Sequence, residues 1–181
     1  NAERLARKVL HKSQSYHLVE LQWEASLLLR RTYAMQGRSQ LAERMQEEVS
    51  ALQQQMNQLM MVRGWVEAAT SRIKYCQSAY VEYVPELKTQ AAQAFEAETA
   101  YANPFFKRYG IELSLLQAYY ANDFDLRVWA LGQMGELMQD YPHVADDQLL
   151  INTELTSISR NTFTGRPQEA PMHLQKAQAV T

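Results

Sequence analysis

The sequence contains few residues that cross-link, bend or interrupt a chain. Among its 181 residues there are one cysteine, Cys76, six glycines and five prolines. A single cysteine forms no internal disulfide, which excludes a disulfide-stapled scaffold. Sheets joined by tight turns need glycine and proline at their corners, so the scarcity of both argues against a β-rich fold. Hydrophobic residues make up 46% of the chain, which is enough for a buried core. Together with the scarcity of glycine and proline, this leads us to expect an all-α protein.

Long hydrophobic runs and a general excess of positive charge are also missing. The longest apolar stretches in the first half, 27–29 and 59–62, fall far short of the roughly 18 residues that span a bilayer. The formal net charge is −2, whereas a domain that binds nucleic acid normally carries a basic face or stripe. We therefore expect neither a transmembrane helix nor a nucleic-acid partner.

One local excess of positive charge lies near the start of the sequence. Arg4, Arg7, Lys8 and Lys12 accompany a single early acid, Glu3. On a helix these side chains form a positive surface, and a solvated helix end is the simplest interpretation. Peripheral contact with an anionic membrane is the alternative, although the bundle would compete for the apolar residues of the same helix.

The residue patterns of common catalytic and metal sites are absent as well. No glycine-rich phosphate loop occurs, and the Glu-x-x-His pairs of di-iron bundles are missing. If their segment is helical, His17, Glu20 and Glu24 share one face, which we interpret as a solvated surface. We assign no catalytic, cofactor-binding or metal-ligating residue. A helical-bundle metal protein or enzyme, with ligands from separated helices, is the alternative function.

The first segment has the pattern of a helix with apolar residues on more than one side. From Ala2 to Gln36 there is neither glycine nor proline, and apolar residues recur every three or four positions. This predicts one long helix that contacts more than one neighbour. Gly37 is expected to end the helix in the left-handed conformation.

A heptad pattern follows and is the clearest signal in the sequence. Apolar residues alternate at spacings of four and three, and we predict that this seam pairs with another helix through Met45, Val49, Leu52, Met56 and Leu59. Beyond Leu59 the seam weakens through Arg63, Thr70 and Gln77, which indicates a change of partner. A single helix over residues 39–84 is about 70 Å long at roughly 1.5 Å per residue, so it predicts an elongated molecule.

The second half has shorter elements and more aromatic residues. Pro85 begins a helix whose remainder, 86–102, is rich in Ala, Gln and Glu and is expected to be exposed or loosely packed. We predict that a corner before Gly110 provides a second partner-binding anchor through Phe105, Phe106 and Tyr109. Two helices should follow, over 111–121 and from Asn122 or Asp123 to about 141, the second with Gly132 and Gly135 placed for close approach of another backbone.

Together these patterns predict an all-α, elongated helical bundle or αα-hairpin with a long heptad-patterned helix, shorter C-terminal helices and an extended C-terminal tail. Three regions are expected: a coiled-coil-like hairpin over 1–102, a smaller helical region over 103–160 and the tail over 161–181. The expected function is that of a non-enzymatic structural or adaptor subunit. It would dock onto other protein subunits, copies of itself included, in an assembly such as a virion, a secretion apparatus or an organellar complex.

Overall fold

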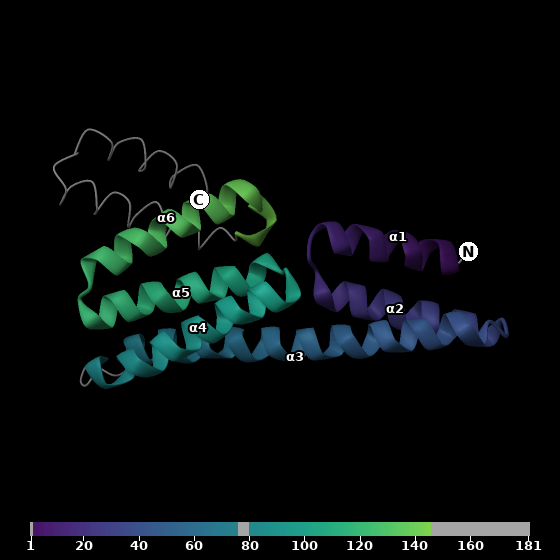
Figure 1. Ribbon diagram of the computed structural model, residues 1–181, viewed down its shortest axis with the longest axis horizontal. Coiled ribbons are helices and arrows are strands. Elements are labelled where there is room, and N and C mark those ends of the chain that lie inside the picture. Colours follow the sequence, from purple (N-terminus) through teal and green to yellow (C-terminus); the bar gives the residue numbers. More distant parts are fainter. Residues whose placement is uncertain (1, 76–79, 146–181) are drawn as a thin grey trace. The chain divides into compact units, whose positions relative to one another are not determined.

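The computed structural model describes residues 2–75 and 80–145, and every regular element in this part is helical (Figure 1). The α-helices are α1 (Ala2–Ser15), α2 (Val19–Met35), α3 (Ser39–Tyr75), α4 (Val84–Tyr101), α5 (Pro104–Ala121) and α6 (Phe124–Asp140), with two short 3-10 helices at Tyr80–Tyr83 and Pro142–Val144. The prediction of an all-α fold is confirmed. The expected C-terminal tail, 161–181, and Cys76 lie outside the described residues.

The chain forms two compact units, Asn1–Gly64 and Trp65–Thr181. Gly64 lies inside α3, so this helix contributes to both units. Helices α4 and α5 pack against each other within the second unit. The boundary between regions that the sequence predicts after residue 102 lies between these two helices.

The single helix predicted for residues 2–36 is wrong, because the chain turns sharply between α1 and α2. His17 adopts the left-handed conformation with φ of 55°. The Leu18 amide donates to the Ser13 carbonyl at 2.9 Å, and the His17 amide donates to the Gln14 carbonyl at 3.1 Å. This pair of bonds is the Schellman motif that ends many helices. Glycine usually occupies the left-handed position of this motif. Because histidine occupies it here, nothing in the sequence indicated that a helix ends at this point.

The turn allows α1 to fold back along α2 (Figure 1). Ala6 of α1 and Leu29 and Tyr33 of α2 form a buried cluster. Ala42 and Met45 of α3 pack against this cluster, so the first unit is built from three helices. Met45, which the sequence places in a seam for another helix, therefore contacts the core of its own unit.

Gly37 ends α2 as the sequence predicts. Its φ is 71°, the Gly37 amide donates to Ala34 at 3.1 Å, and the Arg38 amide donates to Tyr33 at 2.9 Å. The resulting corner brings α3 back along α2, where the Ser26 hydroxyl contacts the Glu48 carboxylate at 3.1 Å. Arg30 makes a second contact of this kind with Gln46.

Helix α3 buries the predicted seam only in part. Three seam residues, Val49, Leu52 and Val66, are buried. In the second half of the helix Val62 and Ala69, one position before the seam, are also buried, whereas the seam residues Arg63 and Thr70 are exposed. A straight α-helix drifts by about 20° per heptad relative to a seven-residue repeat, so its buried stripe leaves the seam. The helix ends at Tyr75 and residues 80–83 form a 3-10 turn, so a continuous α-helix over 39–84 is excluded.

The second unit is centred on the pair α4 and α5. Helix α4 buries Leu87 and three alanines spaced by three, Ala91, Ala94 and Ala97. The prediction of an exposed or loosely packed helix is wrong because these small side chains let α5 approach closely. At Gly110 of α5, an added Cβ would lie 2.9 Å from Cε1 of Phe95 on α4.

The sequence predicted a corner before Gly110, but this segment is the start of helix α5. The side chain of Asn103 accepts a hydrogen bond from the Phe105 amide at 3.0 Å and caps the helix, with Pro104 in its first turn. Phe105, Phe106 and Tyr109 therefore lie in the first turns of a helix, and Gly110 lies within the same helix.

Helix α6 completes this unit. Of the two caps that the sequence offers, Asn122 and Asp123, it is Asp123 that caps α6, by accepting from the Leu126 amide at 2.9 Å. A core cluster joins Ile111 of α5 to Ala130, Met134 and Leu137 of α6 and to Val144 beyond it. The close backbone approach predicted at Gly132 and Gly135 is wrong for the described residues, because none of their atoms lies within 4 Å of a Cβ built at either position.

Candidate functional site

The five α3 residues predicted to bind a partner differ in their accessibility. Val49 and Leu52 are buried, and Met45 is half-buried against the α1–α2 cluster. Met56 and Leu59 are half-buried and retain accessible surface. Met60, which the heptad spacing leaves out, is 65% exposed and lies one turn beyond Met56. We refer to Met56, Leu59 and Met60 as the α3 apolar surface.

The three aromatic residues predicted as a second anchor contribute mainly to the core of their own unit. Phe106 is fully buried and stacks on Tyr101, with ring centroids 5.6 Å apart. Phe105 is half-buried against the α5–α6 cluster. Tyr109 is half-buried beside the guanidinium of Arg108, which lies 5.6 Å from its ring centre. These aromatics belong to the second unit, whereas the five α3 residues belong to the first.

Arg108 itself joins the segment after α6 to α5. Its Nε donates to Glu112 at 2.7 Å, and its Nη1 donates to the Val144 carbonyl at 2.7 Å. Both members of this ion pair are mostly buried. Because each charge is paired and the carbonyl is satisfied, the contact holds residues 142–145 on the bundle.

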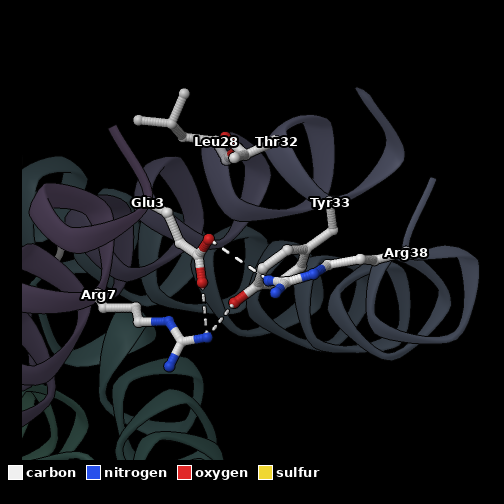
Figure 2. Close-up of polar contacts among 6 residues, drawn as sticks. All are labelled: Glu3, Arg7, Leu28, Thr32, Tyr33 and Arg38. Atoms are coloured by element: carbon white, nitrogen blue, oxygen red, sulfur yellow. Dashed lines mark hydrogen bonds and ion pairs between the residues drawn. The ribbon is translucent and has the colours of Figure 1, made fainter. Parts of the chain in front are cut away.

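A polar cluster links α1 to the corner between α2 and α3 (Figure 2). The Glu3 carboxylate contacts Arg7 at 2.7 Å and Arg38 at 3.5 Å through its two oxygens. Arg7 also donates to the hydroxyl of Tyr33 at 3.0 Å. The guanidiniums of both arginines lie 6.0 Å from the centre of the Tyr33 ring. Glu3 is the one acid of α1, and these contacts engage its charge.

The charge of Arg7 is stabilised within this cluster. Its hydrogen bond to Tyr33, followed by the proximity of that hydroxyl and of Glu3, raises the pKa of Arg7. A pKa that is higher in the folded state contributes stability at every pH below the ordinary arginine value, and this contribution is lost only as the pH rises through the raised value. Arg7 therefore adds no pH dependence of stability near neutrality.

The weak metal-site candidate of the sequence does not have the expected geometry. His17 lies in the turn between α1 and α2, so it does not share a helical face with Glu20 and Glu24, which are exposed on α2. Within residues 2–75 and 80–145, no three His, Cys, Asp or Glu side chains gather in a way that could hold a metal ion. No helix in the same part of the chain is long and apolar enough to cross a membrane.

Comparison with protein-family models, with curated proteins and with solved structures finds no match to this chain.

Proposed function

We propose that the chain is a non-enzymatic structural or adaptor subunit that docks into a larger protein assembly by helix pairing, with the C-terminal tail as a further contact. The observation that carries this proposal is the α3 apolar surface. Met56, Leu59 and Met60 lie on one side of α3 at spacings of three and four, and their side chains are half-buried or exposed. Apolar side chains gathered in this way on a helix commonly form a contact for another protein.

The chemistry of this surface is that of an adaptable helix contact. Methionine side chains are unbranched and polarisable, so they adjust to the shape of a partner. Gln54 and Asn57, which lie nearby on α3, are exposed and polar. A partner helix would therefore pack on one side of α3 and leave the opposite side in water.

Charge substitution on the α3 apolar surface tests helix pairing. Met56→Glu with Met60→Glu should abolish pairing, because two carboxylates would be buried without partners. The matched control, Ala51→Glu with Gln54→Glu, adds the same two charges at exposed positions on the other side of α3. Light scattering after size exclusion gives the particle mass. Self-pairing is supported if the unmodified chain has a particle mass that is a multiple of 20.9 kDa and only the first variant has the mass of a single chain.

Pairing with a different protein is tested by photo-crosslinking in the cells that produce the chain. A photoreactive residue in place of Met60 should yield a cross-linked product of discrete mass, and the same residue in place of exposed Gln54 should not. If the isolated chain is a monomer at all concentrations and neither position cross-links, the subunit proposal is rejected.

A further inference from the structure

A second set of apolar side chains is exposed on the α1–α2 pair. Leu5 is 63% exposed and Met35 is 89% exposed, and Val9, Tyr16, Leu21 and Leu28 are each more than one third exposed. We refer to the six residues together as the outer apolar face: Leu5, Val9, Tyr16, Leu21, Leu28 and Met35.

These side chains lie on one side of the pair, opposite α3. Successive residues of a helix are about 100° apart, so Leu5 and Arg7 lie on opposite sides of buried Ala6. Arg7 reaches Tyr33 and the corner where α3 begins, which places Leu5 on the other side. The same geometry applies to α2.

On α2 the central buried residue is Leu29. Arg30, one residue later, contacts Gln46 of α3, so Leu28, one residue earlier, lies away from α3. In Figure 2 Leu28 lies away from the contact between Arg7 and Tyr33. Val9 and Tyr16 continue the line of Leu5, and Leu21 and Met35 lie seven residues before and after Leu28.

A row of cations borders this face along α1. Arg4, Lys8 and Lys12 recur at a spacing of four, are exposed, and adjoin Leu5 and Val9. The acid of α1 is engaged by Arg7 and Arg38, so it does not offset this row. The two acids of α2, Glu20 and Glu24, are placed by the helical repeat on the border of α2 away from α1.

The first unit as a whole is also cationic. Residues 1–64 contain nine Lys or Arg and six Glu, a formal charge of +3, whereas residues 65–181 contain nine Lys or Arg and fourteen Asp or Glu, a charge of −5. The excess of negative charge in the full sequence therefore resides entirely in the second unit. A partner of the first unit should be anionic.

We infer that the outer apolar face binds the surface of an anionic lipid membrane. Large apolar side chains beside a row of lysine and arginine are typical of helices that lie in the headgroup region of a bilayer. Ala2, Arg4, Leu5 and Lys8 line a partly open depression at the start of α1. Two cations beside an apolar side chain suit a lipid phosphate. Self-association that stacks α1 on α1 would bring two rows of cations together, which like-charge repulsion opposes.

Flotation of the full chain with vesicles tests this inference. The chain should float with vesicles that contain phosphatidylserine and should not float with phosphatidylcholine alone, and added salt should reduce binding. Each cation at an anionic surface contributes about 1 kcal/mol, so each one removed should lower binding roughly fivefold. Arg4→Gln with Lys8→Gln should therefore weaken binding about 25-fold. Arg44→Gln with Lys88→Gln, which removes two exposed cations elsewhere, should change it far less.

A second pair of double variants tests the contribution of the apolar side chains to vesicle binding. Leu5→Gln with Val9→Gln should reduce vesicle binding, whereas Leu41→Gln with Met61→Gln, at exposed positions on α3, should not. Circular dichroism checks that each variant remains helical. Equal binding to both kinds of vesicle, or equal loss in both cation variants, would overturn the inference. The inference would also be overturned if the chain did not float and instead formed a dimer that is lost in the Leu5→Gln with Val9→Gln variant. The outer apolar face would then pair with a second copy.

Discussion

At the scale of single residues, two helical glycines differ completely in their surroundings. Gly110 in α5 faces the ring of Phe95, whereas Gly132 in α6 faces open space among the described residues. Both are helical and have no positive φ, so backbone conformation does not require glycine at either position. The difference arises from packing alone.

Alanine substitution should therefore have opposite effects at these two glycines. Gly110→Ala places a Cβ 2.9 Å from Phe95 Cε1 and should destabilise the protein by about 1–3 kcal/mol, because the ring must move within a packed helix pair. Gly132→Ala adds a methyl group without a clash and should stabilise the helix by up to about 1 kcal/mol. Urea unfolding of both variants measures whether each substitution lowers or raises the free energy of unfolding. Equal stability of both variants would mean that the Phe95 ring does not lie close against Gly110.

At the scale of elements, the chain reverses direction by helix caps that use different residues. Gly37 and Asn122 end α2 and α5 in the left-handed conformation, as helix ends commonly do. His17 ends α1 in the same conformation, although histidine has a Cβ that opposes it. The bonds from Leu18 and His17 to the end of α1, together with the packing of α1 on α2, hold this turn in place.

The turn at His17 should be sensitive to the type of side chain. His17→Val should destabilise the first unit by about 1–2 kcal/mol, because a β-branched residue is strained at positive φ. His17→Asn should be close to neutral by comparison, since asparagine tolerates this conformation. Both variants remove the imidazole, so the difference between their urea midpoints isolates the backbone effect. If the two midpoints coincide, left-handed strain does not control this turn.

At the scale of the whole molecule, each unit has a hydrophobic cluster of its own. Ala6, Leu29 and Tyr33 form the cluster of the first unit, and residues of α5, α6 and 142–144 form that of the second. A helix shared between them, α3, connects the units through the backbone. The two clusters should therefore respond separately to local changes.

Hydrogen exchange of the full chain measures this independence. Gly110→Ala should accelerate exchange of amides in α5, such as Leu113, and leave those in α2, such as Leu29, unchanged. Leu29→Ala should have the reciprocal effect, with a loss of about 2–5 kcal/mol in the first unit. Acceleration of both regions by either variant would show that the units unfold together.

The sequence by itself determined the helical class and several helix ends. Scarcity of glycine and proline, apolar residues at spacings of three and four, and the caps at Gly37 and Asp123 act over a few neighbouring residues, so their effects can be predicted locally. The turn at His17 escaped prediction because its conformation depends on the packing of α1 against α2. Local propensity at that position favours continuation of the helix.

Only the tertiary structure decided which apolar side chains are buried. The heptad spacing treats Met45, Leu52 and Met56 alike, yet Met45 packs on a core cluster, Leu52 is buried and Met56 is half-buried. Alanines of α4 that looked like an exposed surface form a buried contact, and Leu5 and Leu28 remain exposed. A periodic pattern specifies which residues share a side of a helix, whereas burial depends on which helix, if any, covers that side.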